Sequence, residues 1–281
     1  MKQLLMVAAA LCLSAPLAAQ SRLETFTLHS AILNTEKTCT VYLPDGYDSD
    51  TTRRYPVLYL LHGAAGCHTD WSVKGNMRQI ADEAFASGAA LPMVVVMPDA
   101  AGEGENYTGR HMGYFNVPGW EYERFFFEEF LPGVEEHYRI LADKEHRAIS
   151  GLSMGGGGTA AYALHHPELF SSACPMSGLL DVFPRPRDYE DAFQRSVVDN
   201  SPTKLLREMG DKELDAVRTI RWWVDCGDDD FLWRCNINFY ALMRERNVPL
   251  QYRMRDGGHT WRYWQTVLPD ALTFVSNGFG K

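Results

Sequence analysis

One serine is surrounded by glycines in a pattern that favours nucleophilic chemistry. The segment "ISGLSMGGGG" (149–158) places Ser153 between Gly151 and Gly155, after an apolar run and before a helix-forming run. Gly-x-Ser-x-Gly at a strand-to-helix turn is a nucleophile elbow, in which larger flanking side chains would collide. The turn strains the serine backbone and sets a helix N-terminus beneath developing negative charge. Two other interpretations are a glycine-rich loop that only packs tightly and a phosphate loop, although no lysine follows the glycines.

A serine nucleophile needs a base, and the last part of the chain supplies one. The loop "RDGGHTW" follows the last predicted strand and contains His259, the final histidine of the nine. In folds with this elbow, the acid and then the base lie on loops after the carboxyl ends of later strands. The preceding strand ends in "CGDDDFL", which offers Asp228, Asp229 and Asp230. Only one of them can hold the histidine tautomer, and the pattern alone does not choose among them.

A negatively charged intermediate would also need backbone donors. The first is expected to be the amide of Met154, directly after the serine. The second is expected from the loop "LLHGAAG", where we favour Ala64 and keep Gly63 and Ala65 as alternatives. Small side chains there would leave room for an acyl group, whereas the plain alternative is a turn at the end of a strand. Two such amides would form an oxyanion hole.

The elements that must position these residues alternate between strand and helix. "YPVLYLLHG" and "LPMVVVMPD" are continuous apolar runs, which are typical of central strands covered on both faces. The opening runs "ETFTLHS" and "KTCTVYL" alternate and predict an antiparallel hairpin at one edge. The order predicts an α/β fold with a mainly parallel sheet and helices on both faces. Residues 181–216 have little strand character and are expected to form a lid-like excursion over the sheet's carboxyl edge.

Length, charge and the first residues limit the function classes. The chain has 281 residues and a formal net charge of −9, which argues against nucleic acid or an anionic membrane as a partner. Lys2 and the short apolar run "LLMVAAALCL" predict a signal peptide over residues 1–20, too short to span a bilayer. We therefore expect a single exported domain over 21–281, secreted or periplasmic, without a membrane anchor.

The cysteines indicate neither a metal site nor a disulfide framework. Because Cys12 would leave with the signal peptide, an odd number remains, which leaves at least one free thiol. Cys67 lies in a loop and is the favoured member of any disulfide. The spacings do not resemble a zinc site, and adjacent His165 and His166 would point to different faces of a helix. The remaining cysteines are Cys39, Cys67, Cys174, Cys226 and Cys235.

Several segments resemble the esterase D-like α/β-hydrolases, from about residue 25 to 275. They include "LLHGAAGCHTDW", "GLSMGGGGTAAYALHHPELF" and "CGDDDFLWRCNINFYALMRERNVPLQYRMRDGGHTWRYW". That family contains feruloyl and acetyl-xylan esterases of carbohydrate esterase family 1, S-formylglutathione hydrolases and mycolyltransferases. The resemblance implies an α/β-hydrolase fold and ester hydrolysis through an acyl-enzyme, with no metal or organic cofactor. It maps the acid to Asp230, with Asp229 second, and the oxyanion donors to Met154 and the residue after Gly63.

The expected export selects among the substrates of that family. Esters of plant polysaccharides, feruloyl or acetyl, lie outside the cell, whereas S-formylglutathione is a cytosolic thiol ester. The alternatives are a general carboxylesterase or acyltransferase on other small or lipid esters, a serine peptidase of the prolyl-oligopeptidase kind, or a non-catalytic glycan-binding relative. The sequence leaves the oligomeric state open. Aromatic residues expected near the mouth could stack on a feruloyl ring or sugar, or simply pack the core: Trp71, Tyr107, Tyr114, Trp120, Trp233 and Trp261.

Overall fold

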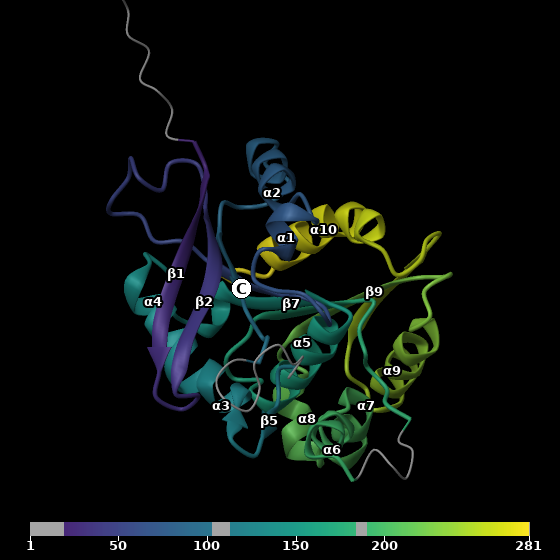
Figure 1. Cartoon of the computed structure of the whole chain (residues 1–281). Helices are drawn as coiled ribbons and strands as arrows, with labels where there is room; N and C mark the ends of the chain where they lie inside the picture. The colour runs from purple at the N-terminus through teal and green to yellow at the C-terminus, as the bar shows by residue number, and fades with distance from the viewer. Residues whose placement is uncertain (1–19, 103–112, 184–189, 281) are drawn as a thin grey trace, which may run out of the picture.

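A central eight-stranded sheet organises the protein (Figure 1). The computed structural model describes residues 20–102, 113–183 and 190–280, so the predicted signal peptide and Tyr107 lie outside the described residues. The strand order is β1-β2-β4-β3-β7-β8-β9-β10. The strands are β1 (Arg22–Ser30), β2 (Thr35–Leu43), β3 (Val57–Leu61), β4 (Val94–Pro98), β7 (Arg147–Leu152), β8 (Ser172–Met176), β9 (Arg221–Gly227) and β10 (Leu250–Arg255).

Strand direction agrees with the predicted fold class. β1 pairs antiparallel with β2, and β2 pairs antiparallel with β4. From β4 through β3, β7, β8 and β9 to β10 every neighbouring pair is parallel. The predicted edge hairpin and mainly parallel sheet are therefore confirmed. The carboxyl ends of β3, β7, β9 and β10 consequently meet at one edge of the sheet.

Helices cover both faces of the sheet, as Figure 1 shows. On one face pack α1 (Asp70–Val73), α2 (Met77–Ala86) and α10 (Trp261–Ser276). In the central strand β3, Leu58 and Leu60 point into that layer, while Tyr59 and Leu61 point into the other, and all four are fully buried. This alternation explains the continuous apolar run, because each strand must satisfy two cores. The other face carries α3 (Tyr122–Phe125), α4 (Leu131–His137), α5 (Met154–His165), α7 (Pro202–Glu208), α8 (Asp211–Val217) and α9 (Trp233–Glu245).

The helical segment around Pro132 continues across the proline. A π-helical turn, η1 (Phe126–Phe130), joins α3 to α4, and Pro132 lies in the first turn of α4. Pro132 supplies no N–H donor, and it lies just after the π-helical turn, where the helical hydrogen-bond pattern changes. Phe126 and Phe130 are buried against Tyr59 of β3.

The described residues of the predicted excursion form three helices. α6 (Ala192–Asp199) lies beside a small hairpin of β5 (Asn116–Val117) and β6 (Trp120–Glu121), where the Ser196 hydroxyl donates to the Asn116 carbonyl at 2.7 Å. α7 instead packs against α5 and α9 and buries Leu206 completely. Unlike α7, α6 is exposed or half-buried along most of its length, as expected of a lid.

The five cysteines after the predicted signal peptide are all free thiols. Three of them are buried in strands, namely Cys39 in β2, Cys174 in β8 and Cys226 in β9, and burial raises the pKa of the Cys39 thiol to about 12. Within the described residues no helix is both long and apolar enough to cross a bilayer.

Candidate active site

Ser153 occupies a sharp bend between β7 and α5. Its backbone has φ 56° and ψ −117°, a conformation that L residues rarely adopt. A Cβ on Gly155 would lie 2.5 Å from the carbonyl oxygen of His62, and one on Gly151 would lie 2.6 Å from the carbonyl oxygen of Gly155. These obstructions are backbone atoms that cannot move aside. The two flanking glycines are therefore required by space, as the sequence pattern predicts.

Ser153 is joined to His259 and Asp230 by two hydrogen bonds. The Ser153 hydroxyl lies 2.9 Å from Nε2 of His259, and Nδ1 of His259 lies 2.8 Å from Oδ2 of Asp230. Because a carboxylate only accepts, Nδ1 carries the proton and Nε2 is free to accept the serine proton. Residues 153, 230 and 259 come from three different loops at the carboxyl edge of the sheet. This is the arrangement of a nucleophile, a base and an acid that orients the base.

The Asp230 carboxylate is held ionised. It is completely buried, and its Oδ1 accepts a hydrogen bond from the Leu232 amide at 2.8 Å. Burial by itself would raise its pKa, but hydrogen bonds from His259, the Leu232 amide and Ser177 outweigh burial and lower the pKa below 3.8. An ionised acid at this position keeps the histidine in the tautomer that accepts from Ser153.

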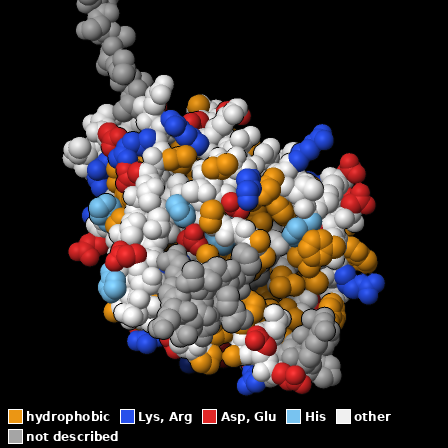
Figure 2. Space-filling model, in the orientation of Figure 1, with side chains coloured by type: hydrophobic (Ala, Val, Ile, Leu, Met, Phe, Trp, Pro, Cys, Tyr) orange, Lys and Arg blue, Asp and Glu red, His pale blue; other side chains and the backbone are white. Residues whose placement is uncertain are grey.

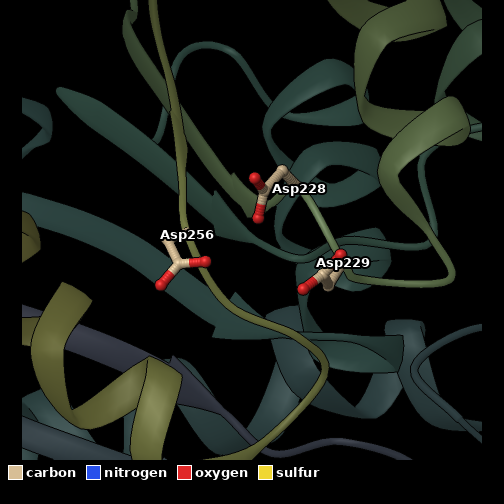
Figure 3. Close-up of side chains that lie close together, drawn as sticks. All are labelled: Asp228, Asp229 and Asp256. Atoms are coloured by element: carbon tan, nitrogen blue, oxygen red, sulfur yellow. The ribbon is translucent and has the colours of Figure 1, made fainter.

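The two other aspartates of the "DDD" run lie away from His259. Asp228 and Asp229 are exposed, and with Asp256 of the neighbouring loop they form the cluster in Figure 3, whose carboxylate oxygens lie within 4.8 Å of one another. Asp228 accepts from the Gly257 amide at 3.1 Å, so it shapes the loop that leads to His259. The geometry therefore favours Asp230 over Asp229 for the acid. Exposed carboxylates alone do not define a metal site, and none was predicted.

Two free amides lie beside the serine. Within the described part of the chain, the backbone N–H groups of Met154 and Ala64 donate to no other residue. Met154 is the first residue of α5, where helical N–H groups are unpaired and the helix dipole is positive. Ala64 and Ser153 line the same two pockets. The structure thus brings together the three residues favoured for the nucleophile and the oxyanion hole.

His62 fixes the direction of the Ala64 amide. Nδ1 of His62 lies 2.8 Å from the Gly63 carbonyl oxygen, and Nε2 accepts from the Ala100 amide at 2.9 Å. The ring is therefore neutral with its proton on Nδ1, and burial lowers its pKa in agreement. Because the peptide unit is planar and trans, holding the Gly63 carbonyl on one side directs the Ala64 N–H to the other.

Two pockets meet at Ser153 and differ in character. The first, which we call the apolar pocket, has a volume of about 290 Å³, and its walls include Leu179, Phe193 and Val197. The second, the His259-side pocket, has a volume of about 250 Å³ and contains His259, Asp70, Lys74 and Trp261. α6 contributes Phe193 and Val197, so the lid-like helix forms one wall of the apolar pocket.

Two of the aromatics expected to contact substrate follow the alternative interpretation and pack in the core. Trp71 and Trp120 are each 1% exposed and pack in the hydrophobic cores. The Trp71 indole donates to the Leu61 carbonyl at 3.0 Å, which satisfies its polar atom inside the protein. Tyr114 is also buried, although its ring forms part of the apolar pocket. Trp261 does line the His259-side pocket.

The exposed aromatics cluster at the start of α9. Figure 2, in the orientation of Figure 1, shows hydrophobic side chains gathered on the side of the molecule where β9 and α9 are labelled. Phe231 is 71% exposed, its ring lies 4.4 Å from the His259 ring, and it borders the apolar pocket. Trp233 is 39% exposed at the first turn of α9. Sequence reasoning missed Phe231 and Phe193, although the position of Phe231 directly after the acid was a usable signal.

Comparisons with known proteins agree with this geometry. Residues 30–275 match the model of the family described as "Putative esterase". A solved ferulic acid esterase is 43% identical, with a TM-score of 0.86 over 92% of this chain and 100% of that chain. An endo-1,4-beta-xylanase/feruloyl esterase of Xylanibacter ruminicola is 37% identical over half of this chain, which corresponds to only 19% of that relative. An acetyl esterase of Caldicellulosiruptor saccharolyticus is 25% identical over 78% of this chain and 82% of its own length.

Proposed function

This chain belongs to the esterase family of α/β-hydrolases and is a carboxylic ester hydrolase, and from that premise we propose that it removes feruloyl groups from plant polysaccharides. The observation that carries the proposal is the Ser153–His259–Asp230 relay opening onto an apolar pocket. The relay supplies ester hydrolysis, and the pocket supplies a place for an aromatic acyl group.

In the proposed reaction Ser153 attacks the ester carbonyl while His259 takes its proton. The oxygen that becomes negative is held by the Met154 and Ala64 amides. His259 then gives the proton to the departing alcohol and later activates the water that hydrolyses the acyl-enzyme. Asp230 stabilises the imidazolium and keeps its orientation. These residues require no metal or organic cofactor for this sequence of steps.

The position of the general acid assigns the two pockets. His259 must reach the oxygen of the departing alcohol, and it lines the pocket that also contains Lys74 but not the apolar pocket. The alcohol therefore belongs in the His259-side pocket, and the acyl group belongs in the apolar pocket. Phe193, Val197 and Leu179 suit an aromatic ring there, since apolar surface favours burial of such a group.

The similar proteins support feruloyl as the acyl group. A ferulic acid esterase matches over almost the whole chain, and the Xylanibacter relative joins feruloyl esterase to a xylanase. The acetyl esterase relative favours acetyl as the second candidate, since the same pocket would admit a smaller group. The predicted signal peptide over 1–20 is part of the proposal, because it would bring a secreted or periplasmic enzyme to polysaccharide.

The test compares acyl groups and bond types. The protein is incubated with a fluorophosphonate probe and then assayed with methyl ferulate, p-nitrophenyl acetate and a peptide amide. We expect covalent labelling. We also expect the ratio of kcat/KM for methyl ferulate to that for p-nitrophenyl acetate to exceed the ratio of their uncatalysed hydrolysis rates, because the acetyl ester is intrinsically more reactive. Preference for the amide would indicate a peptidase, and a protein that takes no label would be a binding protein. Hydrolysis of acetyl esters alone would replace feruloyl with acetyl.

A further inference from the structure

We propose that the His259-side pocket is a subsite for a hydroxyl-rich leaving alcohol, in which Lys74 determines specificity. This inference rests on the proposed function, because it takes the ester reaction at Ser153 as given. It adds the chemistry of the alcohol, a neutral sugar, and the side chain that recognises it.

Lys74 offers free hydrogen-bond donors inside the pocket. Its ammonium lies 3.0 Å from the Asp70 carboxylate, and its side chain is 49% exposed, whereas that of Asp70 is 10% exposed. An ammonium has three donors and no acceptor, and Asp70 is the ionic partner of Lys74 in the described part of the chain. Donors thus remain for a ligand, beside the carboxylate that anchors the charge.

The charges of the pair suit a neutral alcohol with several hydroxyls. Lys74 and Asp70 cancel each other, so the pocket presents no net charge from this pair to attract an anion. A sugar hydroxyl both donates and accepts, which matches an ammonium and a carboxylate side by side. Hydrogen bonds to a charged group are stronger than those between neutral groups. A methyl ester, whose alcohol has no second hydroxyl, cannot use these contacts.

The residues around Lys74 are held in place, so the subsite is preformed. The Lys74 carbonyl accepts from the Gln265 side chain of α10 at 2.8 Å. A Cβ on Gly75 would lie 2.6 Å from the Trp71 carbonyl and 3.1 Å from the Trp261 ring, so the chain passes directly beneath that indole. Trp261 also packs edge-on to Trp71 with ring centroids 5.3 Å apart. Trp261 thus presents a fixed aromatic wall to the C–H groups of a sugar, next to the ammonium.

The reaction order determines which kinetic constant reports on this subsite. The alcohol is bound through formation of the acyl-enzyme and leaves before the acyl-enzyme is hydrolysed. Contacts with it therefore act on kcat/KM, which includes acylation, and not on the deacylation step. Two esters of the same acid form the same acyl-enzyme, so any difference between them in kcat/KM belongs to the alcohol.

The experiment compares methyl ferulate with a ferulate ester of arabinose in the wild type and in Lys74→Met. Methionine keeps an unbranched chain and removes the charge. We expect Lys74→Met to lower kcat/KM for the arabinose ester about tenfold or more, and for methyl ferulate by less than about twofold. Lys212→Met, which removes an exposed charge on α8, is the matched control and should change neither value.

The outcomes separate this inference from the proposed function. Equal losses on both esters, or no loss on either, would overturn the alcohol subsite. A wild type that cleaves no feruloyl ester would refute the proposed acyl group. In that case methyl acetate and an acetate ester of arabinose are compared instead. Lys74→Met must then still lower kcat/KM selectively for the arabinose ester.

Discussion

Replacing Asp230 by asparagine tests the proposed relay most directly. The substitution keeps the size of the side chain and removes its charge. The Asp230 carboxylate accepts from His259 at 2.8 Å and from the Leu232 amide at 2.8 Å. Asparagine has one acceptor oxygen, so it can serve only one of these donors and must present its NH₂ group to the other. The matched control is Asp229→Asn, which changes the neighbouring exposed carboxylate.

The size of the expected loss in kcat depends on which of the two donors, His259 or the Leu232 amide, the asparagine oxygen accepts from. If the oxygen faces His259, the ring keeps its tautomer and loses only the charge of its partner, while the NH₂ group opposes the Leu232 amide and lowers stability. A hydrogen bond to a charged group contributes about 1.5–3 kcal/mol, or roughly 10- to 150-fold in rate. If the NH₂ group faces His259, the ring must carry its proton on Nε2 and can no longer accept from Ser153. Loss of the correct tautomer lowers turnover by about 10⁴ in a serine protease triad. We therefore expect kcat to fall by a factor between about 10 and 10⁴.

The assay is kcat and kcat/KM on the best ester from the substrate panel, with circular dichroism to confirm that each variant is folded. Asp229→Asn should keep kcat within about twofold of the wild type, because a surface substitution of this kind removes no buried contact. A loss in Asp229→Asn equal to that in Asp230→Asn would refute the assignment of the acid. A folded Asp230→Asn with nearly normal turnover would refute the relay itself.

Three further predictions follow from the same geometry. Ser153→Ala should abolish fluorophosphonate labelling and lower turnover by about 10⁴–10⁶ while the melting temperature is maintained. Gly155→Ala should lower the free energy of unfolding by about 3 kcal/mol in chemical denaturation, because its Cβ would meet two backbone oxygens at 2.5 and 2.7 Å; Gly133→Ala, which meets only a Leu28 methyl at 3.6 Å, should stabilise the protein by about 0.5–1 kcal/mol. Since the folded-state pKa of Asp230 is lowered, its stabilisation is present above about pH 4 and is lost as pH falls further; Asp230→Asn should therefore show a smaller decrease in melting temperature below about pH 4 than the wild type.

The sequence predicted the central strands well because each of them is buried on both sides. The alternation of β3 between two cores leaves no polar position, so the run "VLYLL" can be little else than a central strand. The pattern around Pro132 does not by itself say whether the helix continues, since a proline ends some helices and begins others. Which of these occurs depends on tertiary packing. In this fold Phe126 and Phe130, just before the proline, pack against Tyr59, and the chain stays helical to His137.

Catalytic candidates were easier to predict than substrate contacts, for a physical reason. An elbow needs glycine at 151 and 155 because backbone atoms fill the space. This requirement fixes the residue types, so it can be recognised in the sequence. An aromatic side chain that packs the core and one that meets a ligand have the same composition. Trp71 and Trp261 pack against each other in a T-shaped arrangement, yet the first is fully buried and, of the two, the second lines the His259-side pocket. Only the fold separates them.

Lys74 is a residue that lies at the site although nothing in the sequence marks it. It is one lysine among many charged residues, and it follows directly after α1, which is only four residues long, so no periodicity marks it. It becomes notable because α1 follows the loop that holds Ala64, and α10 follows the loop that holds His259. The two loops that complete the reaction centre thereby bring their helices together, with Gln265 bonded to the Lys74 backbone and Trp261 beside it. The Lys74 side chain, directly after α1, is therefore placed beside the reaction centre by the same loops that place the oxyanion donor and the base. Changes in this short helix should alter alcohol preference while the relay geometry is kept.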